Sequence, residues 1–308
     1  MRDEESAGRI DLHIHGAFGV DVLDAAPAEL DRMAAGLASR GVAGFLPTLV
    51  PVPLPALRQA VARLSAWIAG RRPGDDRGAL PLGIHFEGPF VSPDRCGALH
   101  AEDLLDARAG NLPGFYDAVA AAPGRSMVTL APEIPGGIEL VRELSRKGFV
   151  VSIGHTSASV ETLDAAFAAG ARHMTHFANA MAPLHHRAVG PVGWGLLRDG
   201  VSIDVIADLK HLAPEMLQLA FRAKKPGSVC LISDAIPPAG IEGDGPSEWT
   251  VWGETLFVDK GEVRNRKGSL AGSIALLDEM ERNLVSIGID AAAVSASVRG
   301  GPRRVLGL

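Results

Sequence analysis

Cysteine is scarce in this 308-residue chain, which contains only Cys96 and Cys230. Two cysteines cannot form a disulfide framework, and neither lies in a Cys-x-x-Cys arrangement, so we expect free thiols in a reducing, cytoplasmic environment. Long apolar segments are also missing. No run approaches the about 18 residues of a membrane span, and residues 1–6 lack the apolar core of a signal peptide. The sequence therefore argues against a disulfide-rich secreted domain and against a membrane protein.

Tyrosine is scarce as well, and acidic residues outnumber basic ones. The chain has one tyrosine, a formal net charge of -6 and no basic run, so it lacks the electrostatic pattern of a nucleic-acid-binding protein. Its hydrophobic content of 47% is typical of a globular protein with a large core. We therefore expect a small-molecule partner, with no nucleic acid and no membrane.

Short apolar runs alternate with alanine-rich amphipathic segments from Ile10 onward, which is the pattern of repeated strand–helix units around a parallel sheet. Eight strands are predicted, at residues 10–15, 42–49, 80–86, 126–131, 149–154, 172–177, 201–206 and 229–233. Eight such units over about 300 residues favour an α/β fold, the (β/α)8 TIM barrel. A doubly wound open sheet is the alternative, but no Gly-x-Gly-x-x-Gly follows the first strand.

Glycine marks the ends of several predicted helices. Residues 28–40 and 54–69 are predicted to be helical and to end before Gly41 and Gly70. A further helix over residues 160–169 follows Ser159, which can cap it, and ends before Gly170.

Residues 247–268 interrupt this rhythm. The stretches 249–252 and 255–258 are β-prone and are separated by Gly253 and Glu254, which predicts a β-hairpin inserted after the eighth strand. We expect it to cover one end of the barrel, with Trp249 and Trp252 packing onto the barrel. No interdomain linker is evident, so residues 1–308 are predicted to form a single barrel domain.

Residue types that commonly bind metals close five of the predicted strands. They are His15, Glu87, His155, His176 and Asp234. In this class of barrel the catalytic groups lie where strands end and the following loops begin. His13 points to the same side as His15, because side chains alternate along a strand, so both histidines can reach one ion.

Imidazole nitrogens and carboxylate oxygens suit zinc, iron and similar divalent ions. Two metals bridged by a carboxylate would use all of these groups. Such a pair lowers the pKa of water toward about 7 and polarises a carbonyl oxygen, which are the two requirements of amide hydrolysis. Asp234 would take the proton from water and pass it to the leaving amine.

Further motifs accompany these residues along the chain, at positions 11–16, 85–90, 130–133, 154–156, 175–181, 206–211, 233–240 and 268–273. Their sequences are DLHIHG, HFEGPF, LAPE, GHT, THFANAM, IADLKH, SDAIPPAG and GSLAGS. In this order they resemble the motifs of the N-acetylglucosamine-6-phosphate deacetylase family, within the amidohydrolase superfamily.

The resemblance implies a metal-dependent hydrolase that removes the acetyl group from N-acetylglucosamine 6-phosphate and releases glucosamine 6-phosphate and acetate. Its members bind one or two divalent ions, zinc or iron. Glu87, His155 and His176 would hold the principal metal, and His13 and His15 would hold a second, with Glu87 as a bridge. Asp234 matches the catalytic aspartate.

The resemblance also implies where the sugar phosphate binds. The matching positions are Asn179, Ala180, Arg187 and His211, and in the family the arginine reaches across a homodimer interface. Arginine suits this task because its planar fork can engage two phosphate oxygens.

Two loops depart from the family pattern. Where the family has Gly, a small residue and a substrate-binding His, this chain has Gly97, Ala98 and Leu99, so His100 is displaced by one position. Leu209 also replaces the family's glycine after the aspartate of the seventh strand. His100 stays a candidate substrate contact. An alternative substrate, another N-acyl amino sugar or a biosynthetic intermediate, stays open.

Two further expectations concern the whole chain. Because few residues precede Ile10 and the sequence stops at Leu308, we expect the family's small β-sandwich to be missing. A barrel that binds metal or ligand without turnover is the remaining alternative, and it is disfavoured because every catalytic position is filled.

Overall fold

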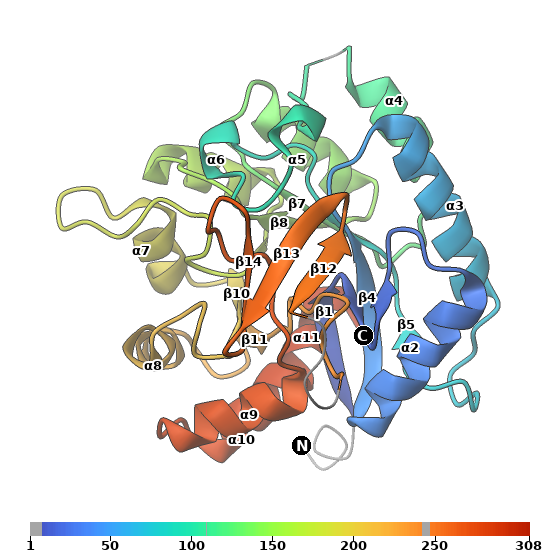
Figure 1. Cartoon of the computed structure of the whole chain (residues 1–308). Helices are drawn as coiled ribbons and strands as arrows, with labels where there is room; N and C mark the ends of the chain where they lie inside the picture. The colour runs from blue at the N-terminus through green and yellow to red at the C-terminus, as the bar shows by residue number, and fades with distance from the viewer. Residues whose placement is uncertain (1–7, 109, 242–246) are drawn as a thin grey trace.

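The apolar segments pair as parallel strands around one axis in the computed structural model, which describes residues 8–108, 110–241 and 247–308 (Figure 1). Neighbouring strands follow the order β1 (Arg9–Ile14), β4 (Val42–Leu49), β6 (His85–Glu87), β7 (Met127–Leu130), β8 (Val150–Ile153), β9 (His173–Met174), β10 (Ser202–Val205) and β11 (Val229–Leu231). All eight predicted strands are present. The third is divided into β5 (Leu80–Pro81), which also pairs with β4, and β6.

Hydrogen bonds between β1 and the segment after β11 close the ring. Ile14 and Ala235 form a parallel bridge. The Ala235 carbonyl accepts the N–H groups of His15 and Gly16 at 2.8 and 3.0 Å, and the His13 carbonyl accepts the N–H of Asp234 at 3.0 Å. The predicted (β/α)8 barrel is therefore confirmed, and the open sheet is excluded.

Helices cover the outside of the ring (Figure 1). They are α2 (Pro27–Ser39), α3 (Leu54–Ala69), α4 (Leu112–Val119), α5 (Gly137–Arg146), α6 (Val160–Ala169), α7 (Gly190–Leu197), α8 (Pro214–Ala223), α9 (Leu277–Ser286), α10 (Ala291–Val298) and α11 (Gly300–Leu306). The predicted helices 54–69 and 160–169 match α3 and α6, whereas α2 begins and ends one residue earlier than predicted. Ser159 caps α6 by accepting a hydrogen bond from the N–H of Thr162 at 3.3 Å.

Polar side chains fill part of the barrel interior. His85 lies 2.9 Å from the Leu12 carbonyl through Nδ1 and 2.7 Å from Thr129 Oγ1 through Nε2. Thr129 in turn contacts the hydroxyl of Thr175 at 2.7 Å. Burial lowers the pKa of His85 to about 3, so this imidazole is a neutral, hydrogen-bonded part of the core.

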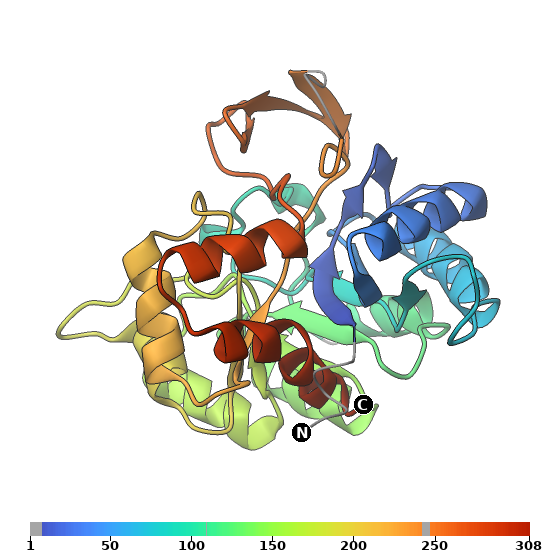
Figure 2. The same cartoon turned by 90° about the horizontal axis from the view of Figure 1, so that it is seen from below.

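The segment after β11 forms three antiparallel strands, β12 (Glu248–Val251), β13 (Glu254–Asp259) and β14 (Glu262–Asn265), which we call the cap sheet. Figure 2 shows the cap sheet at one end of the barrel, with the carboxyl terminus toward the other end. Val251, Leu256 and Val263 pack beneath it against Ile236 and Ala271. The predicted hairpin is present as β12 and β13, and β14 adds a third strand that was not predicted. The polar stretch of β14 pairs through its backbone and buries only every second side chain.

No helix among the described residues combines the length and apolarity that a membrane span requires. The prediction that the chain begins without a signal peptide concerns residues 1–6, which lie outside the described residues.

Two adjacent lysines provide a matched test of how α7 is held. Buried Lys224 donates from Nζ to the carbonyls of Gly195 and Arg198, at 2.9 Å each, whereas exposed Lys225 pairs with Asp199. We expect Lys224→Met to lower the free energy of unfolding by about 1–3 kcal/mol, because two carbonyls lose a charged donor. Lys225→Met should leave it nearly unchanged. Urea denaturation of both variants checks this, and equal losses would contradict it.

Candidate metal centre and active site

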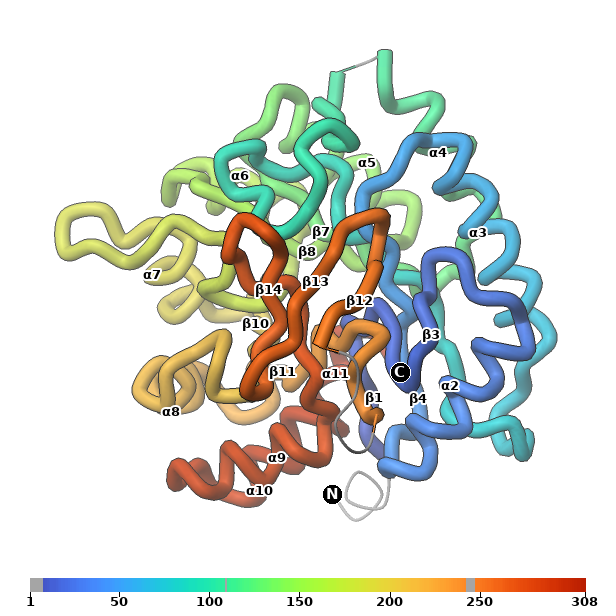
Figure 3. Tube along the Cα trace, in the orientation of Figure 1, coloured from blue at the N-terminus to red at the C-terminus, as the bar shows by residue number. Residues whose placement is uncertain are grey.

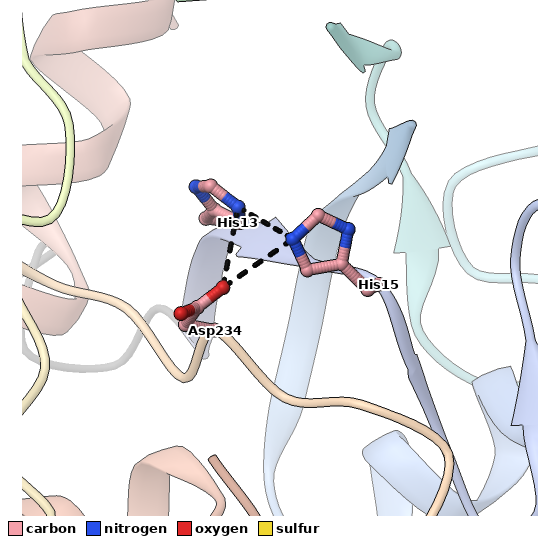
Figure 4. A group of neighbouring side chains, drawn as sticks. All are labelled: His13, His15 and Asp234. Atoms are coloured by element: carbon pink, nitrogen blue, oxygen red, sulfur yellow. Dashed lines mark hydrogen bonds and ion pairs between the residues drawn. The ribbon is translucent and has the colours of Figure 1, made fainter. Parts of the chain in front are cut away.

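His13 and His15 point their Nε2 atoms toward one another and toward Asp234 (Figure 4). The two Nε2 atoms lie 2.9 Å apart. Asp234 Oδ1 lies 3.3 Å from Nε2 of His13 and 3.4 Å from Nε2 of His15. Alternation along β1 and closure of the ring between β1 and β11 thus bring together three buried groups that could hold one ion.

Glu87, His155 and His176 form a second group, at the ends of β6, β8 and β9. Glu87 Oε1 lies 3.0 Å from Nε2 of His155 and 2.9 Å from Nε2 of His176. The two imidazole nitrogens are 3.0 Å apart. These groups also have the types and the spacing of a metal site.

The Glu87 carboxylate joins the two groups. Its second oxygen, Oε2, lies 3.2 Å from Nε2 of His15 and 3.8 Å from Nε2 of His13. Each oxygen of one carboxylate therefore faces a different pair of histidines. This is the arrangement of a ligand that bridges two ions.

The site stabilises positive charge. All six side chains belong to residues that are at most 8% exposed. Burial lowers the pKa of His15, but the carboxylates of Asp234 and Glu87 outweigh burial and raise that pKa to about 10. Burial also lowers the pKa of His176, but the Glu87 carboxylate outweighs burial and raises that pKa to about 9. Burial dominates at His13 and lowers its pKa well below the usual value. A buried centre of nitrogen and carboxylate donors in which two of the imidazoles favour the charged form fits a divalent cation.

Backbone strain directs three of these side chains. His155, His176 and Asp234 have left-handed φ values of 48°, 32° and 49°. Residues other than glycine rarely adopt this conformation, which costs on the order of 1–3 kcal/mol per residue. Because the strain lies where β8, β9 and β11 end, each strand turns sharply and its last side chain faces the centre.

Hydrogen bonds behind the candidate ligands fix their orientation. His155 Nδ1 lies 2.7 Å from the Arg95 carbonyl, so this nitrogen carries the ring proton in the neutral imidazole and Nε2 is free to bind. Asp204 of β10 accepts the backbone N–H of His176 with Oδ1. Its Oδ2 lies 2.9 Å from Nε2 of His173, which is buried beside it. Asp204 therefore fixes the backbone turn that presents His176.

A cavity of about 250 Å³ opens onto both groups. Asn179, Ala180 and His211 line it, so three of the predicted substrate contacts lie beside the candidate metal centre. His211 Nδ1 lies 2.7 Å from Asp208 Oδ2. Burial raises the pKa of Asp208, but His211 outweighs burial and holds that pKa below its usual value.

The other two predicted contacts do not line this cavity. Arg187 is exposed, on the segment between β9 and α7 that projects from the side of the molecule (Figure 3), and its Nη1 lies 2.6 Å from His186 Nε2. His100 Nε2 lies 3.5 Å from Glu254 Oε1 of the cap sheet, and Leu99 lines the cavity in its place. The one-residue displacement thus puts an apolar side chain where a histidine was expected.

Two residues near the site were not assigned to it by the sequence analysis. Trp252, predicted only to pack onto the barrel, lines the cavity and contacts the His15 ring edge-on, with centroids 4.9 Å apart. Its position beside Gly253, at the predicted turn of a hairpin expected to cover one end of the barrel, was the only indication in the sequence that it could reach the site. Asp204 is a charged residue inside an apolar predicted strand, and such a residue needs a buried partner.

Comparisons with known proteins agree with this geometry. The model of a family described as "Amidohydrolase family" matches residues 6–300. The chain is 38% identical over 278 residues to N-acetylglucosamine-6-phosphate deacetylase of Bacillus subtilis (strain 168), covering 90% of this chain and 68% of that protein. It is 36% identical over 302 residues to N-acetylgalactosamine-6-phosphate deacetylase of Escherichia coli O157:H7, covering 97% and 77%.

A solved structure is also similar. It is a point variant of N-acetyl-D-glucosamine-6-phosphate deacetylase from Mycobacterium smegmatis in complex with N-acetyl-D-glucosamine-6-phosphate. The TM-score is 0.87 at 28% sequence identity, covering 98% of this chain and 77% of that one. The two proteins therefore share the same fold over nearly the whole length of this chain.

Replacing Asp204 tests its support of His176. We expect Asp204→Ala to lower metal affinity about 10- to 100-fold, because the His176 turn loses its acceptor. Asp204→Asn keeps an oxygen for the same N–H and should retain most of the affinity. Metal content after dialysis against graded chelator concentrations measures the difference. Equal retention in both variants would rule out this supporting role.

Proposed function

This chain belongs to the amidohydrolase family, and we propose that it is a metal-dependent deacetylase that converts N-acetylglucosamine 6-phosphate into glucosamine 6-phosphate and acetate. The observation that carries the proposal is the pair of metal-ligand groups that share Glu87 beside one cavity. The relatives described above support the substrate class, since they are named as deacetylases of N-acetylated amino sugar phosphates.

We propose that Glu87, His155 and His176 hold one divalent ion, zinc or iron. His13 and His15 hold a second, with Glu87 between them. An ion in this place supplies Lewis acidity, which polarises an amide carbonyl and makes water more acidic. The two oxygens of Glu87, each facing its own pair of histidines, support two ions per chain.

Asp234 moves the proton in this proposal. Its side chain lines the cavity, and its backbone N–H is held by the His13 carbonyl at 3.0 Å. The carboxylate takes a proton from the attacking water and gives it to the amine nitrogen as the amide C–N bond breaks. Acetate and the free amine of the sugar are the products.

Asn179, Ala180 and His211 bind the sugar phosphate in this proposal, and Arg187 reaches the same phosphate from the partner subunit of a homodimer. Arg187 is exposed and lies outside its own cavity, which supports a role across an interface. Leu184 and Leu197, on the same segment and on α7, are 49% and 79% exposed and would supply apolar contact surface. The two free cysteines support a reducing compartment, and we propose the cytoplasm.

A second candidate function keeps the chemistry and changes the sugar. Leu99 cannot make the hydrogen bond that a histidine would make in this cavity, so recognition at that wall is apolar. The similarity to a deacetylase of N-acetylgalactosamine 6-phosphate is nearly as high as that to the glucosamine enzyme. Another N-acylated amino sugar is therefore the alternative substrate.

Acetate release decides between these functions. The purified protein is stripped with a chelator, reconstituted with zinc or ferrous iron, and assayed with N-acetylglucosamine 6-phosphate, N-acetylgalactosamine 6-phosphate and unphosphorylated N-acetylglucosamine. We expect about two ions per chain, release only from the metal-loaded protein, and a preference for the 6-phosphate of N-acetylglucosamine. Preference for the galactosamine compound would favour the alternative, and no release from any sugar would refute the deacetylase.

Asp234→Asn tests the proton transfer. We expect kcat to fall at least about 100-fold, because the amide side chain cannot take the proton. The Glu87, His155 and His176 ligands are unchanged, so at least one ion per chain should remain. Asp117→Asn on the exposed face of α4 is the matched control and should keep full activity. Substantial turnover by Asp234→Asn would overturn this role.

A further inference from the structure

A second cavity of about 220 Å³ lies beside the active-site cavity. Its walls are largely apolar and include Leu23, Val50, Pro51, Val52 and Pro53. Three residues, Ala98, Leu99 and Trp252, line both cavities. They form a shared wall, which we call the acyl wall.

Leu99 is the packed centre of the acyl wall. It is 8% exposed and belongs to a buried cluster with Val50 and Val91, against which Trp252 packs. The neighbouring His100 is turned toward Glu254 of the cap sheet and lies at the edge of the second cavity. The wall is therefore apolar on both of its sides.

Trp252 is held firmly in the acyl wall. It occupies the two-residue turn between β12 and β13, where Trp252 and Gly253 have left-handed φ values of 52° and 79°. Its ring rests edge-on against His15 and packs against the cluster of Val50, Val91 and Leu99. The indole is thus held by the turn of the cap sheet, by this apolar cluster and by the candidate metal centre.

The order of the strands places the β4 side of the second cavity, behind the acyl wall, across the barrel from the predicted sugar-phosphate contacts. Val50 and Pro51 follow β4, whereas Asn179 and Ala180 follow β9, and these two strands are four places apart in a ring of eight. The candidate metal centre lies between them. A substrate with its phosphate at the β9 side and its amide at the centre extends its acyl group toward β4.

We propose that Leu99 and Trp252 set the length of the acyl group that this enzyme removes. The inference rests on the proposed deacetylase function. A two-carbon acyl group ends at the wall, whereas each additional methylene would have to displace Leu99. Behind the wall the second cavity offers apolar space, so shortening Leu99 joins the two cavities and admits a longer acyl chain.

The test compares two substrates that differ only in acyl length, N-acetyl- and N-butanoylglucosamine 6-phosphate. We expect the natural chain to favour the acetyl compound at least about tenfold in kcat/KM, since one methylene more or less in an apolar pocket changes this constant by about that factor. Leu99→Ala should raise the butanoyl-to-acetyl ratio at least about tenfold. Because the fraction of folded protein cancels in the ratio, loss of stability cannot imitate this result.

Leu23→Ala is the matched control. The substitution removes the same side-chain atoms, but Leu23 lines only the second cavity and not the active-site cavity. The butanoyl-to-acetyl ratio of kcat/KM should therefore stay within about twofold of that of the natural chain. Leu99→Val, a smaller truncation, should raise the ratio in the same direction if Leu99→Ala does not fold.

Three outcomes would overturn the inference while leaving the deacetylase function in place. They are an unchanged ratio in both Leu99 variants, an equal rise in Leu23→Ala, or efficient butanoyl hydrolysis by the natural chain. If the metal-loaded natural chain hydrolyses neither compound, the proposed function fails, and the inference fails with it.

Discussion

The buried carboxylate of Glu87 is the constraint on which the rest of the site depends. A charge removed from water needs opposite charge close by, and Glu87 is surrounded by four histidines from three different strands. Burial raises its pKa, but the imidazoles, His13 first among them, outweigh burial and keep the pKa well below the usual range. The ring of parallel strands matters because it brings these side chains around one carboxylate.

Much of this arrangement could be predicted from the sequence because each candidate ligand lies on or directly after a predicted strand. Because side chains alternate along a strand, His13 and His15 are expected to point to the same side. Glu87, His155 and His176 are recognised as candidate ligands because each follows an apolar run where a barrel strand ends. The barrel then brings the strand ends together without any further information from the loops. The (β/α)8 fold was predictable for the same reason, since eight apolar runs separated by amphipathic segments leave few other solutions.

The remainder depended on contacts that no local pattern encodes. The loop that carries Leu99 and His100 has no periodic pattern, so the sequence does not indicate which of the two side chains faces the cavity. In the structure Leu99 lines the cavity and His100 faces Glu254. The third strand of the cap sheet is too polar to be recognised from its sequence, because its pairing with β13 is made by the backbone. The predicted third strand is interrupted at residues 82–84, where the N–H of Ile84 is taken by the hydroxyl of Ser126, a partner 42 residues away.

Closure of the ring between β1 and β11 has a consequence for the synthesis of the protein. His13 and His15 leave the ribosome long before Asp234, which completes their group from a position far along the chain. Contacts between such distant segments form late in folding. A growing chain therefore carries an incomplete candidate metal centre until the last barrel strand has emerged, and a prematurely terminated chain that lacks this strand has neither a closed barrel nor the full set of candidate ligands.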